Sequence, residues 1–247
     1  MYTLTSDQFV LLGEKLDSPV LKAIAGDRTI ADRAAAEQEL IDLKALNNAE
    51  LKEQIAILDD GYDRRVTRLD QADQPYEALA VKGDVLVAVN QTSIKEWANK
   101  ITTFTIAVEP ANTYLESLKK YLGFIETGDN QLLRKFISKV SVANHLKYLD
   151  TMQRITLPIA VKKYRRSYGF KTQEMYMFNA FLFDKNNFKF TYEEGGKKLD
   201  AEVLHSGVFQ IISFRGKNLF GQETNNYYHL GMKKSFEAVR KTLGLKK

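Results

Sequence analysis

The residues best suited to binding chemistry lie in the segment 157–171, which reads LPIAVKKYRRSYGFK. It holds five cations and three aromatic residues and no acid. Cations bind phosphates with release of counterions, and aromatic rings stack on unpaired bases. The segment therefore predicts a surface for single-stranded nucleic acid or for an acidic protein partner. The expected contact residues are Lys162, Lys163, Tyr164, Arg165, Arg166, Tyr168 and Lys171, extended by Arg215, Lys217, Lys233 and Lys234. The alternative is that the aromatic rings belong to the core and the cations form its solvated rim.

The other residues that could do chemistry have simpler structural interpretations. The three histidines, at positions 145, 205 and 229, show no metal-ligand spacing. The carboxylates at 59, 60 and 63 lack the glycine and the final glutamate of a calcium loop, so we interpret them as a solvated helix end. The run GGKK at 195–198 lacks the first glycine and the hydroxyl of a phosphate loop, so it predicts a hairpin turn. The sequence predicts no metal site and no cofactor.

Composition narrows the catalytic classes further. The chain has 247 residues and no cysteine, which excludes a thiolate nucleophile, a disulfide scaffold and cysteine-based zinc sites. Ser206 stands in LHSGV and not in the Gly-x-Ser-x-Gly turn of a hydrolase. We therefore expect a protein that is not an enzyme, although carboxylates brought together from distant positions would not be visible in the sequence.

Charge divides the chain into two parts. Residues 1–130 carry 14 Lys and Arg against 22 Asp and Glu, a net charge of −8, and residues 131–247 carry 22 against 9, a net charge of +13. Of the 27 aromatic residues, 9 lie in the first part and 18 in the second. Such a chain is suited to bind an anionic partner with its basic part, or to contact copies of itself through opposite charges.

The acidic part carries the signals of short helices. Thr5 and Gln8 have the spacing of a capping box, and Ser18 precedes a proline at the first helical position. Two further stretches of helical periodicity follow. The expected helices begin near residues 5, 18, 29 and 50. Helices this short depend on tertiary packing for their stability.

The stretch between residues 79 and 123 mixes strand and helix signals. Residues 79–89 predict a hairpin, with a buried helix as the alternative. Ser93 and Glu96 have capping-box spacing, and apolar residues follow at helical intervals, so we expect an amphipathic helix over 93–108. A further helix is expected over 110–123.

The basic part alternates apolar and polar residues with the period of strands. Turn residues separate its apolar runs, which indicates an antiparallel meander closed by an amphipathic helix. The expected strands are 174–183, 188–192, 199–203 and 208–214, and the expected terminal helix is 232–243.

Together these features predict an α+β fold. A mainly helical N-terminal module, residues 1–155, with a small hairpin near 79–89, precedes a basic, aromatic-rich module, residues 156–247, that is an antiparallel meander with a terminal helix. We expect a non-enzymatic structural subunit of a larger protein assembly, such as a virion or tail component, that binds other subunits through complementary charges. The alternative is a nucleic-acid-binding accessory protein. The sequence shows no leader peptide and no apolar run long enough to span a membrane, so we expect no membrane partner and a cytoplasmic or intracellular protein, the interior of a virion included.

Overall fold

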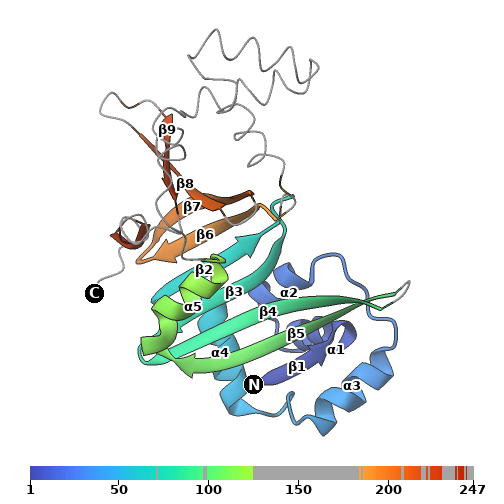
Figure 1. Cartoon of the computed structure of the whole chain (residues 1–247). Coiled ribbons are helices and arrows are strands. Elements are labelled where there is room, and N and C mark those ends of the chain that lie inside the picture. The colour runs from blue at the N-terminus through green and yellow to red at the C-terminus, as the bar shows by residue number, and fades with distance from the viewer. Residues whose placement is uncertain are drawn as a thin grey trace. The chain divides into compact units, whose positions relative to one another are not determined.

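The chain forms an α+β fold, as the sequence predicts. The computed structural model describes residues 1–70, 72–96, 99–124, 184, 186–206, 209–217, 221, 223–229, 237, 239–241 and 243. These belong to two compact units (Figure 1). The first comprises residues 1–119 and 189–198, and the second comprises residues 120–188 and 199–247. The predicted boundary at residue 155 lies outside the described residues and stays a prediction.

The first unit consists of short helices and an antiparallel sheet. Its helices are α1 (Ser6–Lys15), α2 (Pro19–Ala25), α3 (Arg33–Asp42), α4 (Ala49–Asp59), the short 3₁₀ helix η1 (Ala111–Thr113) and α5 (Tyr114–Tyr121). Its strands are β1 (Tyr2–Thr5), β2 (Arg64–Leu69), β3 (Pro75–Lys82), β4 (Val85–Glu96), β5 (Asn99–Pro110) and β6 (Phe188–Glu194). They lie in the order β1-β5-β4-β3-β2-β6. Within the described ranges, no helix is long and apolar enough to cross a membrane.

The four predicted N-terminal helices are confirmed, and their caps explain where they begin. Thr5 and Gln8 form the predicted capping box of α1, and the Ser18 hydroxyl accepts a hydrogen bond from the third residue of α2. The third helix begins at Arg33 and not near residue 29, because Asp32 accepts a hydrogen bond from the backbone of Ala35. Local capping chemistry therefore sets the helix starts.

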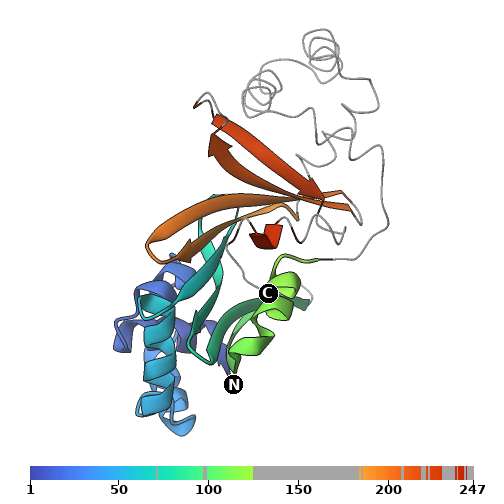
Figure 2. The ribbon, with the colours of Figure 1, turned by 90° about the vertical axis from the view of Figure 1, so that its left-hand side faces the viewer.

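Helices cover one face of this sheet and α5 covers part of the other. In Figure 2 the blue and cyan helices α1–α4 lie on one side of the strands, and the green α5 lies on the other. The core on the first side includes the stacked rings of Phe9 and Phe104, whose centroids are 4.0 Å apart. Arg65 contacts the same side, since its guanidinium donates to the carbonyls of Leu58 and Asp59 at the end of α4.

The predicted hairpin near 79–89 is confirmed as β3 and β4, but the predicted helix over 93–108 is wrong. Residues 85–96 and 99–110 are paired strands, with Ser93 opposite Thr102. Seven of the eight residues from Ile101 to Val108 are β-branched or aromatic, and pairing with β1 and β4 buries alternate ones such as Phe104 and Ile106. Strand pairing with a distant segment therefore overrides the helical periodicity.

Strand β6, predicted over 188–192, pairs with β2 although about 125 residues separate them in sequence. Arg64 and Glu194 are opposite in the register and form an ion pair of 2.7 Å, and Arg65 and Glu193 do the same. The predicted turn after β6 is confirmed, since Gly195 and Gly196 adopt positive φ values of 55° and 74° that other residues rarely adopt.

The described part of the second unit contains most of a three-stranded antiparallel meander. It contains β7 (Lys197–Ser206), β8 (Phe209–Lys217) and β9 (Glu223–His229). The first two confirm the strands predicted over 199–203 and 208–214, whereas β9 was not predicted. Of the predicted terminal helix, residues 237 and 239–241 are helical. The strand predicted over 174–183 lies outside the described residues.

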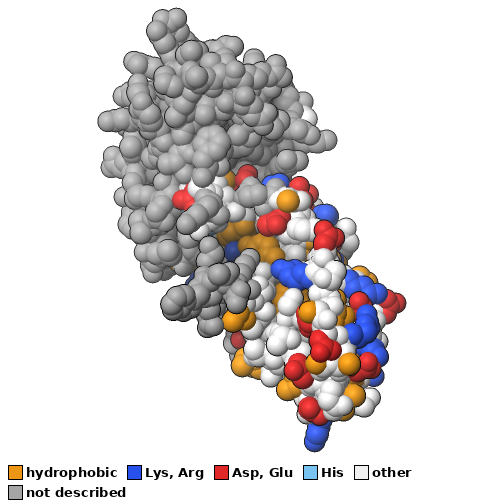
Figure 3. Space-filling model, turned by 90° about the vertical axis from the view of Figure 1, so that its right-hand side faces the viewer, with side chains coloured by type: hydrophobic (Ala, Val, Ile, Leu, Met, Phe, Trp, Pro, Cys, Tyr) orange, Lys and Arg blue, Asp and Glu red, His pale blue; other side chains and the backbone are white. Residues whose placement is uncertain are grey.

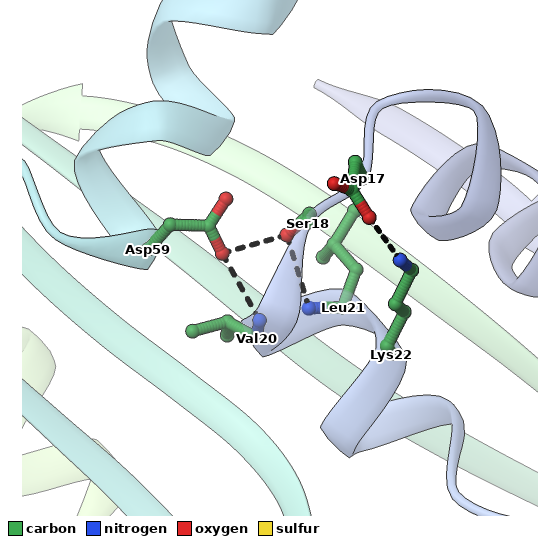
Figure 4. Close-up of polar contacts among 6 residues, drawn as sticks. All are labelled: Asp17, Ser18, Val20, Leu21, Lys22 and Asp59. Carbon is green, nitrogen blue, oxygen red and sulfur yellow. Dashed lines mark hydrogen bonds and ion pairs between the residues drawn. The ribbon is translucent and has the colours of Figure 1, made fainter.

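Asp59 joins α4 to the start of α2 (Figure 4). One of its carboxylate oxygens, Oδ1, accepts hydrogen bonds from the Ser18 hydroxyl at 2.7 Å and from the backbone N–H of Val20 at 3.0 Å. Ser18 is fully buried, and its own hydroxyl oxygen caps the backbone of Leu21 at 3.2 Å. The first turn of α2 therefore depends on a carboxylate that lies 39 to 41 residues further along the chain.

We expect Asp59→Ala to destabilise the first unit by about 1–3 kcal/mol, because it removes a charged acceptor from two donors of which one is buried. Urea unfolding followed by circular dichroism measures the change. Asp60→Ala is the matched control, since Asp60 is exposed and its side chain has no hydrogen-bond partner in the described part of the chain. Equal stability of the two variants would contradict this role of Asp59.

Candidate protein interface

The predicted basic segment falls outside the residues that the structure describes. This applies to its seven contact residues and to Lys233 and Lys234. Arg215 and Lys217 lie on β8, in register with Asn225 and Glu223 of β9. The structure therefore does not test whether these residues form one surface, and the predicted nucleic-acid contact stays a prediction.

The carboxylates at 59, 60 and 63 form no metal site. No group of histidines and carboxylates within the described ranges could hold a metal ion. Asp59 caps α2, and Asp63 accepts a hydrogen bond from the backbone of Gly83 at 2.8 Å. Two of the three acids are thus acceptors for distant backbone groups, and the sequence-based interpretation as a solvated helix end missed this role.

The face of the first unit's sheet that points away from α1, α2 and α4 changes character along the strands. Where β5 ends, α5 packs on it, and Ser117 of α5 donates to Glu109 of β5 at 3.2 Å. The sheet residues in this part are apolar and buried; they are Val66, Leu79, Leu86, Phe190 and Tyr192. This part of the face is a second hydrophobic layer.

No described helix covers the other part of the same face, and its residues carry no charge. We call it the threonine face, and it consists of Thr3 and Thr5 of β1, Ala88, Asn90 and Thr92 of β4, and Thr103, Thr105 and Ala107 of β5. The register aligns Thr3, Thr105 and Asn90 in one row across the three strands. All eight residues except Ala88 are exposed or half-buried. None carries a charge, whereas 27% of the whole chain is charged.

Most polar groups of the threonine face are unpaired. Thr5 caps α1, but the other polar side chains of the face make no hydrogen bond within the described part of the chain; they are Thr3, Asn90, Thr92, Thr103 and Thr105. A surface that is depleted of charge and rich in unused hydroxyl groups resembles the central region of a protein–protein interface more than an ordinary solvated surface. The face therefore presents donors and acceptors that a partner can use.

A buried ion pair borders this face. The register that pairs Ala78 with Val89 brings Glu77 level with Asn90, and Glu77 forms a 2.8 Å ion pair with Arg68 of β2. Burial raises the pKa of Glu77, although Arg68 acts in the opposite direction. The Arg68 guanidinium also lies 5.0 Å from the centre of the Tyr76 ring, and burial raises the pKa of Tyr76 to about 12.

A second polar cluster lies beneath the start of α5. Glu194 accepts from Arg64 at 2.7 Å and from the Tyr192 hydroxyl at 3.0 Å. The buried Tyr114 hydroxyl lies close enough to Arg64 and Glu194 for their charges to influence its pKa. It has no hydrogen-bond partner within the described ranges. Burial raises the pKa values of Tyr114 and Tyr192, so both hydroxyls stay protonated at neutral pH. The cluster therefore ties β2 and β6 together beneath the start of α5.

The acidic helices do not present one uniform field. Figure 3 shows acidic and basic side chains interspersed over the described part of one face. Three exposed ion pairs lie among these helices, namely Lys15–Glu37, Arg33–Glu14 and Lys22–Asp17. Exposed pairs of this kind contribute little to stability, but they neutralise part of the acidic charge locally.

Comparison with known proteins gives a likeness of fold. No protein-family model matches the sequence, and no curated protein sequence matches it. Among matching chains of solved structures, one belongs to the Mycobacterium tuberculosis type VII secretion system chaperone EspG5 in complex with the PE25-PPE41 dimer. The TM-score is 0.51 and the identity 14%, over 91% of this chain and 89% of that chain. At this identity the likeness concerns the fold alone.

We expect Arg68→Met to destabilise the protein by about 3 kcal/mol, because it leaves the Glu77 carboxylate buried without its ion-pair partner. The double variant Arg68→Met/Glu77→Met should lie within about 1 kcal/mol of the wild type, since it removes both charges together. Urea unfolding of the wild type and of both variants measures the effect. A double variant that is as unstable as Arg68→Met would contradict this expectation. The loss of stability would then come from removing the ion pair and not from leaving one charge unpaired.

The raised pKa of Glu77 predicts a pH dependence. Because the folded-state pKa lies above the ordinary value of 4.5, the stability that this carboxyl contributes is fully present below that value and is lost as pH rises through the raised pKa. The wild type should therefore gain stability relative to Glu77→Gln as pH falls from 7 to 4. Paired urea titrations at several pH values measure the difference. The assignment would be contradicted if the wild type lost stability relative to Glu77→Gln as pH falls.

Proposed function

We propose that this chain is a non-enzymatic protein-binding subunit of a larger assembly, and that the threonine face is part of its binding surface. The observation that carries the proposal is an uncharged sheet face that no described helix covers. Apart from Thr5, its hydroxyl and amide groups lack partners within the described part of the chain. Unused groups of this kind are common at a solvated surface, but the lack of charge among the eight residues of the threonine face agrees with the depletion of charge at the centre of protein interfaces.

The fold likeness supports the same proposal. The similar solved structure is that of a chaperone in complex with a protein dimer. A chaperone-like role for this chain, in which it holds a protein partner before or during assembly, agrees with the polar and adaptable chemistry of the threonine face. Contacts through complementary charges and a place in a virion remain predictions from the sequence, as does the nucleic-acid contact of the basic segment.

Quantitative co-purification from cells that produce the protein tests this proposal. We expect Thr103→Arg/Thr105→Arg to lose at least about 90% of its partner, because two desolvated charges in an interface cost several kcal/mol. The double variant Thr29→Arg/Thr102→Arg is the control, since it makes the same chemical change at positions outside the threonine face.

Nuclease treatment separates the two candidate partners. A partner that survives nuclease and is lost only from Thr103→Arg/Thr105→Arg supports the protein-binding proposal. A partner that is lost equally from both double variants, or that disappears with nuclease, would contradict it. Circular dichroism of each variant before the experiment shows that the fold is retained.

A further inference from the structure

We propose that the outer edge of β4 at residues 91–96 binds an extended segment of a partner protein in which apolar and acidic residues alternate. The segment adds a strand to the sheet there. This inference goes beyond the proposed function, because it concerns a second surface and a different mode of binding. The alternative is that the same edge pairs with a second copy of this chain.

The ends of β4 and β5 extend past the neighbouring strands (Figure 1). The two strands pair with each other along their whole length. β3 pairs with β4 only as far as Val89, and β1 pairs with β5 only over 103–106. We call residues 91–96 and 99–102 the arm. Within the described part of the chain, no strand lies on the outer side of β4 over about 20 Å of the arm.

The backbone groups of this edge are available to a partner. The Glu77 side chain of β3 accepts a hydrogen bond from the backbone N–H of Gln91, so this N–H points away from β5. The backbone groups of an antiparallel strand alternate between its two sides. Those of Ser93 and Lys95 therefore point away from β5 as well. In the described ranges they make no backbone hydrogen bond outside the hairpin. An extended segment can bind to such groups.

Two lysines on the arm indicate the charge of the segment. Lys95 and Lys100 stand directly opposite each other in the register. Like charges at opposite positions weaken a strand pair. Lysine at a strand edge also discourages pairing with arbitrary extended chains. The two lysines therefore carry a cost that an acidic segment removes, and they favour such a segment over others.

The same lysines argue against a second copy at this edge. Two arms that paired along β4 would bring four lysines together in one short ladder, since each copy supplies Lys95 and Lys100. Like charges that face each other across an interface oppose association. Charge complementarity therefore favours an acidic segment of another protein.

The register also gives the side-chain pattern expected of the segment. The pair Ser93 and Thr102 lies on one face of the arm, with the hydroxyls 3.0 Å apart, and the lysine pair follows two positions further on that face. Ile94 and Ile101 pair between them on the other face, where Ile101 is 46% exposed. Glu96 belongs to this second face. The segment should therefore place its acidic residues on the lysine face and its apolar residues on the isoleucine face.

Peptide titrations with the full chain test the inference. The probe is a fluorescent nine-residue peptide of alternating Val and Glu, and a second peptide has Lys in place of Glu. Two further forms of the acidic peptide carry N-methyl groups on one or the other set of alternate amides. Fluorescence anisotropy should show saturable binding of the acidic peptide and at least about tenfold weaker binding of the lysine peptide. Only one methylated form should bind at least about tenfold more weakly, because a strand pairs on one side through alternate amides.

A charge reversal on the arm tests the site. Lys95→Glu/Lys100→Glu should weaken the acidic peptide at least about tenfold and should strengthen the lysine peptide. Lys44→Glu/Lys52→Glu is the matched control, since both lysines are exposed and lie outside the arm. It should change the affinity for the acidic peptide less than about twofold. Circular dichroism shows that each variant keeps the fold.

Three results of the titrations would overturn the proposal. They are no saturable binding of the acidic peptide, equal loss of binding for both methylated forms, and equal affinity for the wild type and for Lys95→Glu/Lys100→Glu. Sedimentation gives a fourth. A wild-type dimer that Lys95→Glu/Lys100→Glu disrupts and Lys44→Glu/Lys52→Glu leaves intact would assign the edge to a second copy.

Failure of this inference is distinguishable from failure of the proposed function. The proposed function is tested on the threonine face by Thr103→Arg/Thr105→Arg, and loss of a partner from that variant would stand whatever the peptides do. Its control, Thr29→Arg/Thr102→Arg, adds a cation on the lysine face of the arm and should not release an acidic segment.

Discussion

The pairing of β2 with β6 is the constraint on which the first unit depends. Arg64 and Arg65 are neighbours on β2 and so point to opposite faces, and each meets a glutamate of β6 in register. A slip of one residue would turn the buried Phe190 and Tyr192 to the other face of the sheet and would keep only one of the two ion pairs. The ion pairs and the burial of these rings therefore fix the register together. Arg65 also binds the end of α4, which ties a late strand to the N-terminal helices.

The described helices cover different parts of the two faces of this sheet. The helices α1, α2 and α4 bury one face, and α5 buries the end of the other face where Arg64, Tyr192 and Glu194 gather. What remains is the threonine face, where β1, β4 and β5 present short uncharged side chains. The surface that we assign to a partner is therefore the part of the sheet for which the described residues provide no helix.

The sequence predicts local structure well where a side chain acts on its own backbone. The capping residues Thr5 and Ser18 and the glycines at 195 and 196 were identified correctly for this reason. The helix predicted over 93–108 is wrong, because pairing with β1 and β4 determines the structure of that segment. The threonine face was missed as well. The alternation of threonine at 3 and 5 and at 103 and 105 is a strand signal, but only the register shows that these residues share one surface.

The measurement that tests the account most directly is site-specific photo-crosslinking in cells that produce the protein. A photoreactive residue at Thr105 should form a nuclease-resistant crosslink to a partner protein. The same residue at Thr29, an exposed position outside the threonine face, should form none. Equal crosslinking at both positions, or a crosslink at Thr105 that nuclease removes, would contradict the assignment of this face as a protein interface.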